Sequence, residues 1–142
     1  MNFEWADGFH APKGVNVEDV AEALDALPAP SPENLLEASK RKRHVLHGEL
    51  WSEGDQVWAQ RGRLERCRKI IGAVQEVIVV GNREIKVRAV EFVKTNGSGQ
   101  WTGIESITRD PDLTDAYLAE IQRLQDQAAA KMARFRMLLK NR

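Results

Sequence analysis

The sequence predicts an α+β protein with an N-terminal helical (helix-turn-helix-like) part, a central antiparallel β-hairpin or meander, and a long C-terminal helix. Apolar residues recur at helical spacing between residues 17 and 71. A β-branched and then alternating run spans residues 74–89, and a second helical pattern extends from residue 112 to about residue 139. We therefore expect an N-terminal helical domain over residues 1–72, a β segment over 73–108 and a C-terminal helix over 109–142.

Two short helices are expected after a leader of residues 1–15, which we expect to form an irregular arm or a packed flap. Asn16 is a favourable N-cap, and Ser31 followed by Pro32 is a second one. Pro28 and Pro30 separate the two helices, because proline cannot continue the first of them. In outline this pair resembles a helix-turn-helix.

A third helix is expected to begin at Ser52 or Asp55, after a turn over residues 44–48. Gly62 lies inside it at a cost of about 1 kcal/mol relative to alanine. Cys67 is the only cysteine, so an internal disulfide and a cysteine-based zinc cluster are excluded. We interpret Cys67 as a small buried side chain. The expected apolar stripe consists of Val57, Trp58, Leu64, Cys67, Ile70 and Ile71.

The β segment is predicted to contain a hairpin that turns at Gly81-Asn82. Ile85, Val87 and Ala89 are expected on its buried face, with Lys86 and Arg88 pointing outward. Residues 96–99 read as a second loop, and residues 101–107 are expected to add a third strand.

The C-terminal pattern predicts one helix that begins after Asp110-Pro111, a cap followed by a proline in the first turn. At about 1.5 Å per residue the helix is roughly 40–45 Å long. We expect part of it to pack against a partner chain as a coiled coil, giving a homodimer or another homo-oligomer. The stripe expected to carry this association consists of Tyr117, Ile121, Leu124, Ala128, Phe135 and Leu138, with Met132 beside it.

Charge is sorted along the chain although its formal net charge is zero. Residues 1–39 contain eight acids and one lysine, whereas residues 40–69 contain nine cations and four acids. Local charge rather than total charge sets the field that a polyanion experiences. The basic segment therefore indicates a candidate surface for nucleic acid.

The first functional hypothesis is a small, non-enzymatic DNA-binding protein that contacts the phosphates of double-stranded DNA. The second of the two short helices carries Glu33 and Glu37 and few donors for base edges, so phosphate contacts are favoured over base readout. The residues expected to make these contacts are Lys40, Arg41, Lys42, Arg43, Arg61, Arg63 and Arg66.

Two other interpretations stay open. Lys40–Arg43 can be a solvated helix end whose cations complement the helix dipole. Alternatively, the acidic segment of one copy pairs with the basic segment of another, which is typical of a protein–protein adaptor. An inhibitor of a host protein is a special case of this second class.

No catalytic constellation, cofactor or metal site is expected. His44 and His47 have a spacing that can hold a metal, but no third ligand set accompanies them, and cations nearby should lower their pKa. The four tryptophans are interpreted mainly as core or interface anchors. The acidic start lacks an apolar signal region and no apolar run is long enough to span a membrane, so a cytoplasmic protein is expected.

The stretch from Leu46 to Ile71 contains Leu46-His47, then Trp51 and nearby acids, and then a helical run with Arg63, Ile70 and Ile71. In this it resembles a pattern found in phage and prophage proteins without an assigned activity. That pattern is Leu-His, an aromatic-Trp-acidic patch, and a helix ending in Ala-Arg-x-Leu-Ile. This chain departs from it in reading Leu50-Trp51-Ser52-Glu53-Gly54-Asp55 at the patch and in having Cys67 where alanine is usual. The resemblance implies a virus-encoded protein of the bacterial host cytoplasm. The matching residues are Leu46, His47, Leu50, Trp51, Glu53, Asp55, Ala59, Arg63, Arg68, Ile70 and Ile71.

Overall fold

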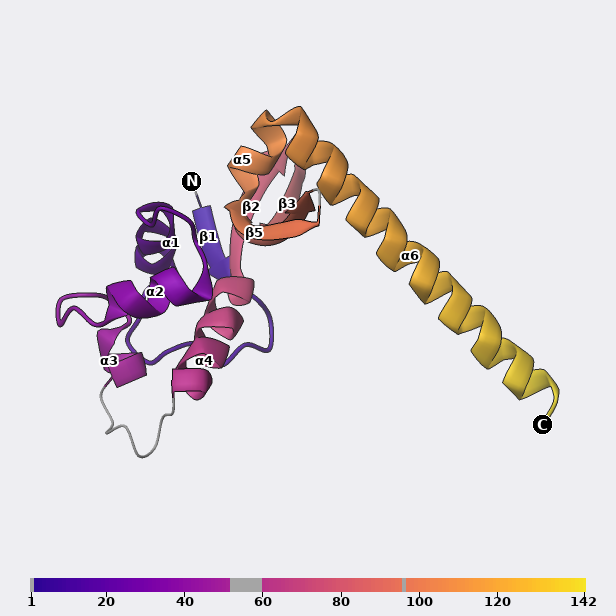
Figure 1. Ribbon diagram of the computed structural model, residues 1–142, viewed down its shortest axis with the longest axis horizontal. Coiled ribbons are helices and arrows are strands. Elements are labelled where there is room, and N and C mark those ends of the chain that lie inside the picture. Colours follow the sequence, from indigo (N-terminus) through magenta and orange to yellow (C-terminus); the bar gives the residue numbers. More distant parts are fainter. Residues whose placement is uncertain (1, 52–59, 96) are drawn as a thin grey trace. The chain divides into compact units, whose positions relative to one another are not determined.

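The computed structural model describes residues 2–51, 60–95 and 97–142 and confirms the predicted α+β class. Its contacts divide the chain into two compact units. The first unit comprises residues 1–92 and 100–104, and the second comprises residues 93–99 and 105–142. Figure 1 shows the order of the elements along the chain.

Two capped helices open the helical part of the first unit. In α1 (Val17–Asp25) the Asn16 side chain accepts a hydrogen bond from the Glu18 amide, as the capping pattern predicted. In α2 (Pro32–Ser39) the Ser31 hydroxyl accepts from the Asn34 amide, and Pro32 occupies the first turn. Both predicted helix starts are confirmed.

Two further helices follow. The short α3 (His47–Trp51) replaces part of the turn that was expected after the basic run. The longer α4 (Gln60–Ala73) continues as a helix through Gly62. Here tertiary packing outweighs the low helix propensity of glycine. The predicted start of this helix at Ser52 or Asp55, with Val57 and Trp58, lies outside the described residues.

A three-stranded antiparallel sheet completes the first unit. The order is β1 (Asn2–Trp5), β2 (Val74–Val80) and β3 (Arg83–Arg88), with Phe3 opposite Glu76 and Ile78 opposite Ile85. The predicted leader, an irregular arm or a packed flap over residues 1–15, was wrong for residues 2–5, which form an edge strand on β2. Residues 6–15 contain no helix or strand, and Phe9 and Val15 pack against the core. The hairpin at Gly81 is confirmed, and its positive φ of 62° fits glycine.

The core of the first unit is contributed by α1, α2, α3, α4 and β2, together with Leu46 and Val90. Leu35, Ile70, Ile71 and Val74 are fully buried, and Phe3 and Phe9 pack against this cluster. The apolar face predicted for β3 is only partly covered. Val87 is half-buried, whereas Ile85 keeps 42% of its surface exposed.

A second, two-stranded sheet is formed by β4 (Val90–Thr95) and β5 (Ser98–Gly103). The third strand predicted over residues 101–107 was wrong in its bounds. The strand ends at Gly103, and residues 104–109 form the helix α5 (Ile104–Arg109). Ile104 and Ile107 are β-branched, but both belong to α5, and Ile107 is buried from this helix.

The predicted C-terminal helix is confirmed as α6 (Pro111–Lys140). The Asp110 carboxylate accepts from the Asp112 amide, and Pro111 stands in the first turn. The Thr114 hydroxyl donates to the Ile107 carbonyl at 2.6 Å, which ties the first turn of α6 to the end of α5. None of the 30 residues of α6 is buried.

Candidate functional site

The basic turn is defined here as Lys40–Arg43, the four cations that follow α2. All four residues are exposed. The Lys40 ammonium pairs with Glu37 at 2.9 Å, one helical turn earlier, and it lies 6.0 Å from the Trp51 ring. Arg41, Lys42 and Arg43 thus stay exposed members of the predicted phosphate-binding set.

Arg63 lies inside the first unit instead of on its surface. The residue is 4% exposed, and its Nε donates to the Leu50 carbonyl at 3.0 Å. The guanidinium also covers the Trp51 ring at 4.1 Å. The backbone of α3 and a tryptophan therefore hold this cation, which was predicted to contact phosphate.

The Trp51 indole is fixed from its other end as well. Its Nε1 donates to the Ser39 hydroxyl at 2.8 Å, and that hydroxyl donates to the Leu36 carbonyl at 2.6 Å. Ser39 is completely buried. This chain of contacts joins the end of α2 to α3 and α4 through polar groups that are all satisfied.

Arg66 is also held within the chain. Its Nε donates to the Glu49 carboxylate at 2.8 Å, and its Nη2 donates to the His10 carbonyl at 3.0 Å. The Phe9 ring lies 5.2 Å from the guanidinium. Arg66 therefore joins the leader, α3 and α4, which is an architectural role.

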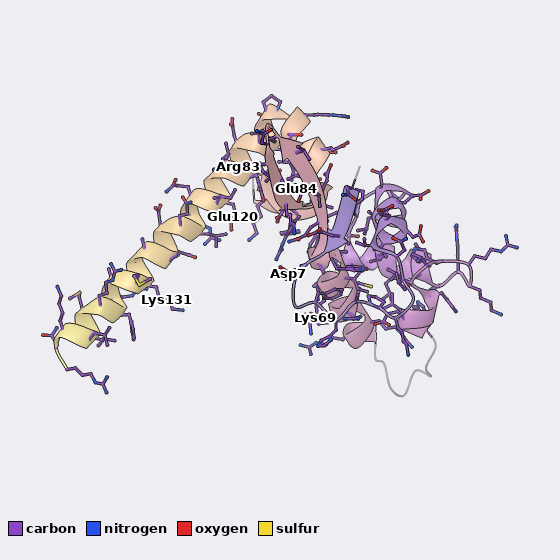
Figure 2. The ribbon with its side chains drawn as sticks, turned by 180° about the vertical axis from the view of Figure 1, so that it is seen from behind. Asp7, Lys69, Arg83, Glu84, Glu120 and Lys131 are labelled. Carbon is purple, nitrogen blue, oxygen red and sulfur yellow. The ribbon has the colours of Figure 1, made fainter. Side chains whose placement is uncertain are left out.

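The outer side of α4 carries mixed charge. Arg61 and Lys69 are exposed, and Figure 2 shows Lys69 among the side chains of the first unit. Arg68 pairs with Glu65 at 3.3 Å and approaches Glu33 at 4.0 Å. These acids reduce the positive field beside the predicted phosphate-binding residues. Of those seven residues, the basic turn and Arg61 are the exposed ones.

His44 and His47 make backbone contacts beside the basic turn. The Nδ1 atom of His44 accepts from the Leu46 amide at 3.1 Å, and the Nδ1 atom of His47 lies 2.9 Å from the Ser39 carbonyl. Burial lowers the pKa of His44, and the nearby His47 and Arg41 lower it further. Across the residues that the structure describes, no three His, Cys, Asp or Glu side chains are grouped to hold a metal.

Cys67 is a buried core residue, as its helical phase predicted. Burial raises the pKa of its thiol to about 12, with the nearby Glu33 adding to the shift. The thiol is thus protonated at neutral pH, and a nucleophilic role is disfavoured.

The second candidate surface is the apolar stripe of α6. Tyr117 and Ile121 are half-buried, whereas Leu124, Ala128, Phe135 and Leu138 are exposed. Leu138 keeps 69% of its surface open. The first part of the predicted stripe is therefore partly covered, and the larger second part is exposed.

Two members of this stripe were not included in the sequence prediction. Leu118 and Leu139 are more than half exposed. Together with Met132 they occupy one heptad position, which directly follows the position of Tyr117, Leu124, Lys131 and Leu138. They widen the apolar face from a two-position seam to three positions of the heptad. The signal was present in the sequence as a further heptad row, in which Met132 and Leu139 are seven residues apart and Gln125 separates them from Leu118. We define the α6 stripe as Tyr117, Leu118, Ile121, Leu124, Ala128, Met132, Phe135, Leu138 and Leu139.

Comparison with known proteins adds no family. Protein-family models, curated proteins and solved structures all fail to match this chain. Among the described helices, none combines the length and apolar character needed to cross a membrane.

Proposed function

We propose that this protein is a non-enzymatic protein–protein adaptor that self-associates through α6. The single observation that carries the proposal is the α6 stripe, in which six large apolar residues each leave more than half of their surface exposed. Exposed apolar surface on this scale, concentrated on one helix face, is typical of interaction sites. An isolated helix also gains most of its stability from packing of such a face.

The organisation of the first unit supports this proposal. Arg63 and Arg66, two of the seven cations expected on a nucleic-acid surface, instead hold α3, α4 and the leader together. Lys40 and Arg68 are paired with acids of the same unit. Part of the charge sorting in the sequence therefore becomes internal structure, whereas the α6 stripe is an exposed apolar surface.

The test is the molar mass of the protein in solution, measured by light scattering or sedimentation over a concentration series. The wild-type chain should be at least a dimer near 100 μM, and Leu138→Ser should shift it toward the monomer. The matched control is Met137→Ser, because Met137 is 63% exposed but lies off the stripe. A wild-type chain that stays monomeric, or equal effects of the two variants, would rule out α6 as the interface.

A second candidate function is contact with the phosphates of double-stranded DNA, and the exposed basic turn favours it. Arg41, Lys42 and Arg43 are adjacent and open to solvent, and Arg61 is exposed on α4. A dimer would carry two copies of this turn, which would add to the affinity for one duplex. From the resemblance to phage and prophage proteins, we also propose that the protein is virus-encoded and acts in the cytoplasm of a bacterial host. A host protein is then another candidate partner.

A gel-shift assay on random duplex across a salt series separates this candidate from the adaptor. Each neutralised phosphate contributes a slope of about −0.9 in log affinity against log salt. The variant Arg41→Ala/Lys42→Ala/Arg43→Ala should lower the magnitude of the slope by about 2.7 per bound chain, since three contacts are lost. No shift near 50 mM salt, or a shift that does not weaken with salt, would exclude DNA binding through this turn.

A further inference from the structure

We infer that α6 pairs with α6 of a second copy in an antiparallel orientation. This inference rests on the proposed self-association and adds the identity and direction of the partner helix. Three features of α6 carry it: the division of its charge, the position of Lys131 between residues of the α6 stripe, and the order of the apolar residues.

The charge of α6 is divided between its two halves. Residues 111–126 contain four acids and only Arg123 as a cation, whereas residues 127–142 contain five cations and no acid. Figure 2 shows Glu120 in the first half and Lys131 in the second. Glu120 is already paired with Arg123. The first half therefore contains no uncompensated cation.

Antiparallel pairing places opposite halves side by side. Packed helix axes are about 8–10 Å apart, which is comparable to the Debye length at physiological salt. Charges on facing helices therefore still influence one another. A parallel pair would instead place five cations beside five cations. Charge complementarity thus selects both a second copy as the partner and the antiparallel direction.

Lys131 gives an independent argument. Tyr117, Leu124, Lys131 and Leu138 are spaced by seven residues, and we call them the core row of α6. Lys131 is the only charged residue in this row. In a parallel pair in register, Lys131 would meet Lys131 of the second copy inside the seam. In the antiparallel pair it meets Ala128, whose small side chain leaves room for the lysine stem to extend toward water.

The apolar residues then form matched layers. With Ala128 opposite Lys131 of the second copy, Leu124 faces Phe135 and Ile121 faces Leu138. Along the flank, Leu118 faces Leu139, and Gln125 faces Met132. A shift by one heptad would instead place Ile121 opposite Lys131. The unshifted register therefore covers the larger share of the exposed stripe.

The test uses two single-cysteine chains, Leu124→Cys and Phe135→Cys, distinguished by a terminal tag. Under mild oxidation the mixture should give a cross-linked heterodimer at least about tenfold more abundant than either self-linked product, since disulfides need Cα atoms within about 7 Å. Cys67 needs no removal because it is fully buried, and the wild-type chain serves as the uncross-linked control.

A second pair, Gln125→Cys and Met132→Cys, probes the flank without removing a core layer. Self-linking of the single variants in place of mixed linking would show a parallel pair and overturn the inference. A wild-type dimer with neither mixed nor self-linked product in either pair would overturn this register of α6. In both cases the self-association of the proposed function would stand, whereas a monomeric wild-type chain would overturn both proposals.

Discussion

In α4 the apolar side chains are covered by the same chain, whereas in α6 most of them are open to solvent. Cys67, Ile70 and Ile71 of α4 are fully buried against neighbouring elements. On α6, Phe135 and Leu138 are each more than half exposed. Both helices have apolar residues at helical spacing, so the periodicity alone does not distinguish a core helix from an interface helix.

The cations of the two helices differ in the same way. Arg63 and Arg66 of α4 bind a backbone carbonyl, a carboxylate and aromatic rings of their own unit. The cations in the second half of α6 are exposed and have no acid within their half of the helix. The comparison supports our proposal, in which α4 stabilises the monomer and α6 mediates self-association.

The largest expected effect contrasts one truncation in each helix. Ile70→Ala should lower the free energy of unfolding of the first unit by about 2–5 kcal/mol, because it opens a cavity in a fully packed core. Phe135→Ala should change the stability of the monomer by less than about 0.5 kcal/mol. Urea unfolding at protein concentrations below dimerisation measures both changes.

The same two variants should reverse their order in the association assay. Phe135→Ala should weaken self-association, and Ile70→Ala should leave the dimer intact under conditions in which the chain is folded. A large loss of monomer stability in Phe135→Ala would show that α6 is covered within its own chain, and the comparison would fail.

The next largest effect is a difference in stability between alanine variants of Arg63 and Arg61. Arg63→Ala should cost about 2–3 kcal/mol, because the Leu50 carbonyl loses a charged donor and the Trp51 ring loses the guanidinium above it. Arg61→Ala, at an exposed position, should cost no more than about 0.5 kcal/mol. Chemical unfolding with tryptophan fluorescence as the readout measures both variants.

Arg63→Lys sharpens this result. Lysine keeps the charge but not the planar group that stacks on Trp51, so it should recover only part of the lost stability. Full recovery would show that charge alone holds Arg63 in place. Equal destabilisation by the alanine variants at 61 and 63 would contradict the buried role of Arg63.

Capping chemistry explains why the helix starts could be predicted. Asn16, Ser31 and Asp110 each accept a backbone hydrogen bond within three residues, a local interaction that the sequence specifies by itself. The hairpin at Gly81 was predictable for the same reason. Local rules of this kind require no knowledge of the distant chain.

Pairing between distant segments could not be predicted in this way. Residues 2–5 form a strand only because β2, some 70 residues later, offers its edge. Arg63 was expected to lie outside because arginine is seldom buried, yet the Leu50 carbonyl and Trp51 satisfy it. Of the candidate site, the basic turn and the α6 stripe follow from local sequence, whereas the burial of Arg63 and Arg66 depends on tertiary contacts.

A smaller effect concerns the one lysine in the core row of α6. Lys131→Leu should tighten self-association by about tenfold, which corresponds to about 1.4 kcal/mol, because an apolar side chain replaces a charged one in the seam. The control is Lys140→Leu, since Lys140 is exposed and lies away from the stripe. Sedimentation equilibrium gives both dissociation constants, and weaker association of Lys131→Leu would place residue 131 outside the interface.

The smallest expected effect is a pH dependence at the basic turn. The pKa of His44 is lowered in the folded chain by burial, by His47 and by Arg41, whereas the unfolded chain has a value of about 6.5. The unfolded state therefore binds a proton more readily, and the stabilising contribution is present above about pH 6.5 and declines as the pH falls below it. Protonation of Nδ1 would also remove the acceptor of the Leu46 amide. His44 is partly open to solvent, so we expect a contribution below about 1 kcal/mol.

Thermal unfolding at pH 7.5 and pH 5.5 should show a smaller pH-dependent loss of stability in His44→Gln than in the wild-type chain. His10→Gln, at an exposed position, should keep the wild-type loss. An unchanged loss in His44→Gln would mean that another group carries the pH dependence, and that the contacts of His44 add little to the stability of the first unit.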